Sequence, residues 1–297
     1  MNRETTTGAA LLQRVSSEGA VVVPLAQAWA ATPEVLRDSA AAAPFAFVAR
    51  LLGVEPLLVE RQPIRPVPEG RSFASTRRDT PLHTDSQMFL HVPAAIQVLF
   101  CVKTATRGGE SVLVDTARLL ARLEQDDPSL AMALFEIERA QRFYFGEVGG
   151  PTIAVRGGHL GWTYTPHAED PVGAALADAV AQEPSLVHAL SPGEALVASN
   201  HRMLHGRRPF EGDRELVRLL VWLERPLAAE ARHVARARTL SLPLDGMTLS
   251  RMRAVLAMMR GVPPAKIAND ARVRESTLYA WRDAFMSGGV TELAAHG

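Results

Sequence analysis

Two side chains able to hold a metal ion stand two positions apart in this sequence. His83 and Asp85 lie in the run Pro81-Leu-His-Thr-Asp-Ser-Gln-Met-Phe-Leu90, which has strand character. Side chains at positions i and i+2 of a strand point to the same face, so one imidazole and one carboxylate would project together. They are two members of the two-histidine, one-carboxylate set that holds non-haem Fe(II) and leaves coordination positions open. The sequence therefore predicts a metal site around this pair.

The third ligand must come from elsewhere, and two histidines compete for the role. Both occur in Asn200-His-Arg-Met-Leu-His-Gly-Arg-Arg-Pro-Phe210, where His205 follows an apolar strand and precedes a glycine. A strand carrying His205 beside the first pair would bring three ligands to one face, so we favour His205 and keep His201 as the alternative. Another His-x-acid pair, His167 and Glu169, is flanked by prolines and is interpreted as a solvated loop pair.

Two arginines stand four residues apart in the apolar stretch 214–223. Arg214 and Arg218 would face the same side of a strand, with Leu216 between them. Buried guanidinium groups need anionic partners, and a bound dicarboxylate would supply them through bidentate pairing. The alternative is that both arginines make structural ion pairs, for which the nearby candidates are Glu194, Glu211 and Glu215.

These motifs, taken in order, resemble one enzyme family. They are His-Thr-Asp at 83–85, Gly-Gly-Glu-Ser at 108–111, His-Gly-Arg-Arg-Pro-Phe at 205–210 and Arg-x-x-x-Arg at 214–218. Together they are similar to the Fe(II)/2-oxoglutarate-dependent dioxygenases, in the taurine dioxygenase and clavaminate synthase-like branch. The likeness covers about residues 70–225. It implies a double-stranded β-helix, or jelly roll, in which His83, Asp85 and His205 hold Fe(II).

The resemblance also implies how the co-substrate 2-oxoglutarate would bind. Its 1-carboxylate and 2-keto oxygens would chelate the metal, and its distal carboxylate would pair with Arg214 and take a hydrogen bond from Ser111. The family more often has threonine at that position, and serine keeps the hydroxyl donor; an ordinary strand hydroxyl is the alternative reading of Ser111. Arg218 would lie near the metal-bound carboxylate or the substrate. With O2, such enzymes release succinate and CO2, and Asp85 favours hydroxylation, desaturation or cyclisation over halogenation.

Composition sets the class of protein. The 297 residues are 47% hydrophobic and 22% charged, which allows a sizeable core. The net charge of zero gives no overall basic field that would indicate a nucleic-acid or membrane partner. The single cysteine, Cys101, lies in an apolar run and is expected to be buried; its isolation excludes an internal disulfide and fits the cytoplasm, where we expect the protein. We expect neither a signal peptide nor a membrane span.

Hydrophobic patterning predicts a mainly β, α+β fold. Short strands with regular turn signals run between residues 94 and 223, with helices expected at 33–52, 117–125, 129–136 and 171–183. Such a barrel has a mouth where small molecules bind, and the loop 68–80 is placed to act as a substrate lid. Arginines 71, 77 and 78 in this loop hint at an anionic substrate group. Trp162 and Tyr164 would either line the pocket or pack in the core.

The last part of the chain has a helical pattern in place of the short strands that precede it. We divide the chain into an oxygenase domain at 1–228, a tether at 229–246 and three helices within 247–297, the last ending at Gly288-Gly289. Residues 262–285 resemble a homeodomain-like helix-turn-helix, which would present Arg274, Thr277, Tyr279 and Arg282 to DNA. Residues 229–297 hold ten Lys/Arg and six Asp/Glu, a net charge of +4 that is modest for a DNA-binding unit. We therefore favour packing, homo-oligomerisation or protein docking over DNA binding.

The sequence thus predicts an oxygenase that hydroxylates, or otherwise oxidises, a C–H bond of a small polar metabolite. A free or carrier-bound amino acid is the substrate class we expect. The alternative is a DNA-binding regulator in which the barrel senses a ligand, and an oxygenase fold without turnover is a third reading.

Overall fold

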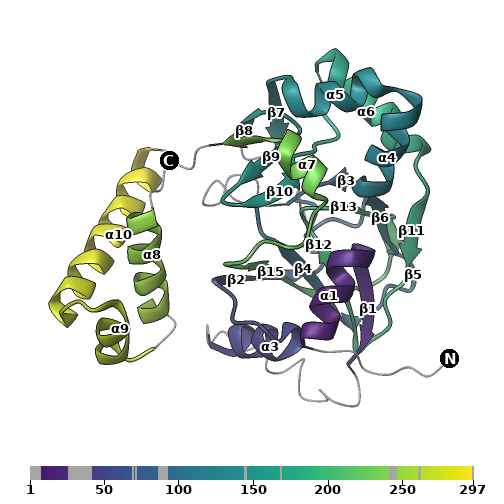
Figure 1. Cartoon of the computed structure of the whole chain (residues 1–297). Helices are drawn as coiled ribbons and strands as arrows, with labels where there is room; N and C mark the ends of the chain where they lie inside the picture. The colour runs from purple at the N-terminus through teal and green to yellow at the C-terminus, as the bar shows by residue number, and fades with distance from the viewer. Residues whose placement is uncertain are drawn as a thin grey trace. The chain divides into compact units, whose positions relative to one another are not determined.

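The computed structural model describes residues 8–25, 42–68, 70, 72–85, 93–143, 146–167, 169–240, 246–259 and 262–295. The chain forms two compact units, drawn in Figure 1: the larger contains Met1–Ser39 and Ala43–Ser241, and the smaller contains Ala40–Ala42 and Leu242–Gly297. None of the helices in the described ranges combines the length and apolar character that crossing a lipid bilayer requires.

Two antiparallel sheets form the centre of the larger unit. Their strands are β1 (Ala20–Pro24), β2 (Leu58–Ile64), β3 (Thr80–His83), β4 (Ile96–Lys103), β6 (Ser111–Asp115), β11 (Ser185–His188), β12 (Glu194–Ser199), β13 (Met203–Arg207) and β15 (Glu215–Trp222). The five-stranded sheet has the order β1-β12-β4-β15-β2, and the four-stranded sheet has the order β11-β6-β13-β3. The predicted α+β fold with antiparallel sheets is confirmed.

Within the described residues, smaller strands and six helices complete this unit. The strands are β5 (Arg107–Gly108), β7 (Arg139–Phe143), β8 (Gly146–Gly150), β9 (Ile153–Arg156), β10 (His159–Trp162), β14 (Phe210–Glu211) and β16 (Arg238–Leu240). The helices are α1 (Ala9–Glu18), α3 (Ala42–Leu52), α4 (Thr116–Asp126), α5 (Pro128–Glu136), α6 (Pro171–Gln182) and α7 (Ala231–Arg236). Of the predicted helix 33–52, residues 33–41 lie outside the described residues.

Aspartates start the three helices α4, α5 and α6. The side chains of Asp115, Asp127 and Asp170 each accept a hydrogen bond from a backbone N–H in the first turn, as expected of an N-cap residue. Proline at the first position of α5 and α6 adds a preset helical φ. Figure 1 shows these helices together on one side of the larger unit and α1 and α3 on the other, with strands between.

Alternation along the strands separates outward from inward side chains. On β4, Ile96, Val98 and Phe100 join the core with α1 and α3, so Gln97 and Cys101 face the opposite way. Inward apolar residues of both sheets then form a core of their own, which includes Cys101, Leu113, Leu196, Met203 and Leu216. The polar residues that share this inward face are therefore brought into the space between the sheets. Trp162 and Tyr164, by contrast, are buried in the core under α4–α6.

Among the strands that the sequence analysis did not predict, β8 and β11 have identifiable reasons. The sequence of β8 is Gly-Glu-Val-Gly-Gly, and its three glycines have a low strand propensity. The strand β11 is an edge strand, and its Leu186 and Val187 are exposed, so it lacks the alternating buried face that predicts a strand.

Part of the predicted tether is ordered on the larger unit. Helix α7 and strand β16 both fall within residues 229–246, and β16 pairs in parallel with β9. Ala237 is buried in the core, and buried His233 lies 3.2 Å from Glu124. The boundary between the units falls after Ser241, because these residues bury side chains on the larger unit.

The described part of the smaller unit forms three helices, α8 (Gly246–Met259), α9 (Pro264–Ala271) and α10 (Glu275–Ala295). They pack around Ala254, Ile267, Ala268 and the fully buried Leu278. The prediction that the last helix ends at Gly288-Gly289 is wrong, because α10 continues to Ala295. Glycine costs a helix interior only about 1 kcal/mol per residue, which the rest of a long helix offsets. A docking, oligomerisation or DNA-binding role for this unit stays a prediction.

Replacing Leu219 by alanine should destabilise the larger unit by about 2–5 kcal/mol, because a fully buried side chain on β15 is lost and a cavity remains. Denaturant unfolding measures the change. The control is Leu186→Ala on the edge strand β11, where the side chain is 49% exposed and the cost should stay within about 0.5 kcal/mol. Equal costs for the two variants would contradict the described core.

Candidate metal and co-substrate site

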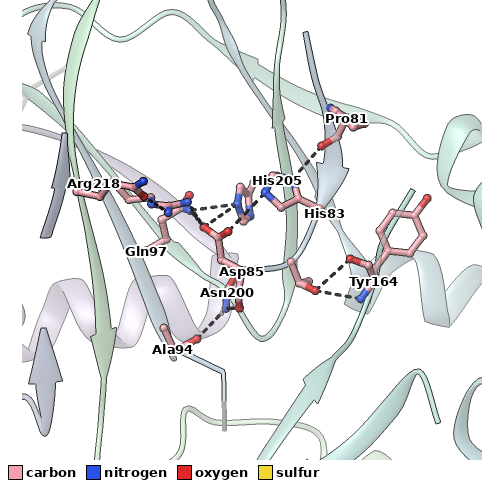
Figure 2. A network of polar contacts seen from close by, with 11 residues as sticks. Pro81, His83, Asp85, Ala94, Gln97, Tyr164, Asn200, His205 and Arg218 are labelled. Atoms are coloured by element: carbon pink, nitrogen blue, oxygen red, sulfur yellow. Dashed lines mark hydrogen bonds and ion pairs between the residues drawn. The ribbon is translucent and has the colours of Figure 1, made fainter. Parts of the chain in front are cut away.

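Three potential metal ligands converge at the inner end of β3 and the middle of β13. His83 is the last residue of β3 and pairs in register with His205 of β13, and their ring centroids lie 4.4 Å apart. The His83 Nε2 atom is 3.5 Å from Asp85 Oδ1, and His205 Nε2 is 3.4 Å from Asp85 Oδ2. One ligand atom from each of the three lies within 4.8 Å of the others, a spacing that a single metal ion can bridge. Figure 2 shows the two imidazoles next to each other beside the carboxylate.

Asp85 is positioned by a side chain and not by strand pairing. The sequence analysis places it inside a strand over residues 81–90, but β3 ends at His83, and residues 86–90 lie outside the described residues. The Asn200 side chain holds it instead: Oδ1 accepts from the Asp85 N–H at 3.0 Å, and Nδ2 donates to the Asp85 carbonyl at 3.1 Å and to the Ala94 carbonyl at 2.9 Å (Figure 2). This clamp fixes the direction in which the carboxylate leaves the chain.

The protonation of His83 suits metal binding. Its Nδ1 lies 2.9 Å from the Pro81 carbonyl oxygen, which only accepts, so Nδ1 carries the proton. The lone pair is then on Nε2, the atom that faces Asp85. Burial, followed by the nearby His83 ring, lowers the pKa of His205. The lowered pKa favours the neutral form of His205, which is the form that a metal requires of its histidine ligands.

A guanidinium and an amide surround the Asp85 carboxylate. Arg218 Nη1 and Gln97 Nε2 both donate to Asp85 Oδ2, the amide at 2.9 Å, and Gln97 Nε2 is also 3.1 Å from His205 Nε2. Arg218 Nη2 donates to Gln62, its neighbour on β2. Burial alone would raise the pKa of Asp85, but the charge of Arg218, followed by the two imidazoles beside the carboxylate, outweighs it and holds the pKa well below its usual range. Asp85 is therefore an anion in the buried site.

The sequence analysis missed Gln97. Its signal was a polar residue inside the otherwise apolar run at 94–102, which on a buried strand calls for a partner. It also left open what Arg218 contacts, and the structure places that guanidinium on Asp85 and on none of the glutamates considered.

Arg214 has no ion-pair partner among the residues that the structure describes. Arg214 is 6% exposed, and neither Glu194 nor Glu211 forms an ion pair with its guanidinium. Burial, followed by the like charge of Arg207, lowers its pKa to about 10. One cavity is lined by Arg214, Ser111, Gln97 and Arg218 and by the two histidines His83 and His205. The Arg214 guanidinium therefore lines the same cavity as the potential metal ligands, and it has no anionic partner among the described residues.

Arg207, a second residue that the sequence analysis missed, ties the loop 72–79 to this cavity. Its guanidinium donates to the carbonyl oxygens of Phe73, Thr76 and Arg78, and it lies over the Phe210 ring at 4.9 Å. The loop in turn contributes to the cavity wall, because Phe73 lines the cavity and packs against the His83 ring with 5.2 Å between ring centroids.

The arginines considered as substrate contacts in this loop have other positions. Arg77 is exposed and donates to the Gly212 carbonyl at 3.1 Å. Arg78 is also exposed, and Arg71 lies outside the described residues. Neither described arginine lines the cavity of the three potential ligands.

His201, the alternative third ligand, is not part of the His83–Asp85–His205 cluster. Its Nε2 lies 3.0 Å from the Pro93 carbonyl, and its ring packs edge-on against His159 at 5.1 Å. Burial, followed by His159, lowers its pKa to about 3. The other His-x-acid pair, His167 and Glu169, is exposed, as expected of a solvated loop pair.

Residues 59–172 match the family described as taurine catabolism dioxygenase TauD, TfdA family, and the predicted resemblance to this branch of the dioxygenases is confirmed. The resemblance of residues 262–285 to a helix-turn-helix stays a prediction.

Two curated relatives match by sequence. A gamma-butyrobetaine dioxygenase from Homo sapiens is 23% identical over 176 residues, which are 51% of this chain and 45% of that protein. A uridine-5′-phosphate dioxygenase from Amycolatopsis sp is 32% identical over 154 residues, which are 45% of this chain and 55% of that protein. The chain thus spans about half the length of the curated relatives it matches.

Among solved structures, an asparagine oxygenase in complex with Fe(II), hydroxyasparagine and succinate is similar. Its TM-score is 0.45 and its identity 20%, over 55% of this chain and 56% of that one.

Replacing Gln97 by leucine should weaken metal binding by about 10–100-fold, because an amide that orients the ligand Asp85 is lost. Anaerobic titration with Co(II), followed by its visible absorption, measures the affinity. Leu99→Ala, which changes an apolar residue of the same strand and cavity, is the matched control and should change the affinity far less. Unchanged affinity in Gln97→Leu would show that the amide has no part in positioning Asp85.

His201 should make the protein less stable in acid. It stays neutral in the folded protein down to a pKa of about 3, whereas an unfolded histidine takes up a proton below about pH 6.5. Its contribution is complete above pH 6.5, and the free energy of unfolding should then fall by roughly 1.4 kcal/mol per pH unit as the pH drops toward 3. In His201→Gln this slope should be absent. Denaturant unfolding at several pH values measures both proteins, and identical profiles would refute the assignment.

Proposed function

We propose that this protein is a non-haem Fe(II)/2-oxoglutarate-dependent oxygenase that oxidises a C–H bond of a small polar metabolite. One observation carries the proposal: a single cavity joins the His83–Asp85–His205 cluster to a buried arginine, Arg214, without an ion-pair partner in the described chain. The match of residues 59–172 to the TauD/TfdA family supports it. The two curated relatives support it as well, since both are named dioxygenases.

The residues fit ferrous iron. Two imidazoles and one carboxylate are the donor set of the facial triad, and the three are close enough to share one ion. His83 presents the lone pair of Nε2 because Pro81 takes its Nδ1 proton. Asp85 is ionised, so binding a cation would release no proton from it. His83, Asp85 and His205 are therefore the residues that would hold the metal.

The residues also fit a dicarboxylate co-substrate. Arg214 would pair with the distal carboxylate of 2-oxoglutarate, and the Ser111 hydroxyl, buried in the same cavity, would donate a hydrogen bond to it. Such a partner relieves the cost of burying the Arg214 charge beside Arg207. Arg218 lies on Asp85, where it would border the metal-bound end of the co-substrate.

When bound, Fe(II), 2-oxoglutarate and O2 supply the oxidising power that removes hydrogen from a C–H bond, with release of succinate and CO2. The chain's own residues orient these groups. Arg218 and Gln97 occupy Asp85 Oδ2, which leaves Oδ1 directed at the His83 side. The carboxylate also fills the position that a halide would need, so hydroxylation, desaturation or cyclisation is the outcome we propose.

We infer that the two antiparallel sheets form the double-stranded β-helix typical of such enzymes. Support comes from their strand order and from the polar residues that alternate onto their inward faces, between which the cavity lies. For the substrate, we propose an amino acid or a similar small metabolite with an anionic group. The names of the relatives support this class, since gamma-butyrobetaine and uridine-5′-phosphate each carry an acidic group.

Purified protein with Fe(II) and O2 should convert 2-oxoglutarate to succinate, and His83→Ala should abolish this. Arg214→Met should weaken binding of 2-oxoglutarate by about 10–100-fold, because a charge-assisted pair is lost, and should leave metal affinity unchanged. Anaerobic titration of the Fe(II) protein, followed by its visible charge-transfer absorption, measures co-substrate binding. Arg142→Met, at an exposed arginine of β7, is the control. If the wild-type Fe(II) protein does not bind 2-oxoglutarate, the proposed function is wrong.

A further inference from the structure

One side chain, Arg207 at the end of β13, holds the loop 72–79 in place. The residue is 8% exposed, and its guanidinium donates to three backbone carbonyls of this loop. Nη1 donates to the Phe73 carbonyl at 3.1 Å, and Nη2 donates to the Thr76 carbonyl at 2.9 Å and to the Arg78 carbonyl. Hydrogen bonds from a charged donor are stronger than neutral ones, so the three bonds tie the loop to β13.

The loop is also bonded to the chain that connects β13 to β15. The Phe210 N–H donates to the Arg77 carbonyl at 3.1 Å, and Arg77 Nε donates to the Gly212 carbonyl at 3.1 Å. The carbonyls of residues 73, 76, 77 and 78 are thus all bonded to β13 or to the segment that follows it. A loop held at this many points is a fixed part of the larger unit.

This loop presents Phe73 to a potential metal ligand. The ring centroids of Phe73 and His83 lie 5.2 Å apart, and both side chains line the cavity. The His83 Nδ1 atom lies 2.9 Å from the Pro81 carbonyl, so the imidazole is held at one edge by this bond and is packed against Phe73. The phenyl ring therefore limits how the imidazole can turn, as long as the loop stays in place.

Arg207 also borders the part of the cavity around Ser111 and Arg214. It pairs in register with Ser111 of β6, so the two side chains share one face of the sheet, and both line the cavity. The Phe210 ring lies 4.9 Å from the Arg207 guanidinium carbon and 5.6 Å from that of Arg214. One buried side chain thus contacts both the loop beside His83 and the aromatic ring beside Arg214.

We propose that Arg207 is a positioning residue of the site: it fixes the loop 72–79 as a wall of the cavity and so keeps Phe73 against His83. The inference rests on the proposed function, since it takes His83 as a metal ligand. Both terminal nitrogens of the Arg207 guanidinium donate to the loop, whereas Arg214 has no ion-pair partner among the described residues. The loop is therefore a wall and not the lid that the sequence suggests.

Trypsin measures whether the loop is held, because it cleaves after arginine only where the segment is released from the fold. Arg77 and Arg78 are exposed, but their carbonyls are bonded to Phe210 and Arg207, so wild-type protein should be cleaved slowly at this pair. In Arg207→Met, cleavage there should be at least about tenfold faster, the effect of losing one charge-assisted hydrogen bond from the closed state.

Three comparisons make this protease test specific to the loop. Arg207→Lys keeps a charged donor and should restore part of the protection. Arg208→Met removes the exposed arginine next in the chain and should leave the rate unchanged. Mass spectrometry follows cleavage at residues 77–78, and cleavage after Arg142 of β7 reports general unfolding. If the rate at 77–78 in Arg207→Met equals that of wild type, or rises only in step with cleavage after Arg142, the proposal is overturned.

Metal binding measures whether this wall positions His83. In anaerobic Co(II) titrations, Phe73→Ala should weaken the affinity about tenfold, the low end of the loss expected when a partner of a metal ligand is removed. Arg207→Met should weaken it as well, although removing a nearby positive charge would by itself strengthen cation binding. Arg78→Ala, which removes an exposed side chain and keeps the carbonyl that Arg207 binds, is the matched control.

The double variant Phe73→Ala/Arg207→Met tests whether Arg207 acts through Phe73. It should bind Co(II) no more weakly than Phe73→Ala alone, because the second change removes a support that no longer has a ring to hold. Additive losses, or Co(II) affinity in Arg207→Met at or above that of wild type, overturn the proposal. Failure of the proposed function is seen separately, as wild-type protein that binds Co(II) but not 2-oxoglutarate, and both tests of Arg207 can still be carried out in that case.

Discussion

The buried carboxylate of Asp85 is the constraint on which the site depends. Burial alone would favour protonation of this carboxylate, and the charge of Arg218 is the largest influence that keeps it ionised. The groups that achieve this come from β4, β13 and β15 and from the end of β3, so both sheets must close around one charge. The site is therefore complete only when the two sheets are assembled, and its electrostatics are those of the whole larger unit.

Arginines divide into two classes inside this unit. Arg218 and Arg139 each have a carboxylate from the chain, and they belong to the framework. Arg214 and Arg156 are as deeply buried and have none among the described residues. Holding unpaired charge lowers the stability of the ligand-free protein, a cost that is commonly met at binding sites. Of the two, only Arg214 lines the cavity of the potential metal ligands, where we propose that an anion binds.

Local patterns predicted a good part of this arrangement. The strand patterns put His205 and Arg218 on inward faces, and the i, i+2 spacing put His83 beside Asp85, whereas Gln97 was missed. The same reasoning missed β11, which has no buried face, and extended β3 past its end, because Asp85 is held by Asn200 and not by a neighbouring strand. The sequence analysis did not identify Arg207, because its partners are backbone carbonyls of a loop. Every residue has a backbone carbonyl, so such a contact has no sequence signal.

By itself, the sequence determined the residue types, their spacing and the order of motifs, and these sufficed for the α+β class, the candidate ligands and the family resemblance. Only the tertiary structure decided which arginine pairs with Asp85, which side chain clamps it and which histidine faces away. The reason is physical: Asp85 meets Asn200 across 115 residues and Arg218 across 133, and contacts at such separations follow from how sheets pack rather than from any local pattern.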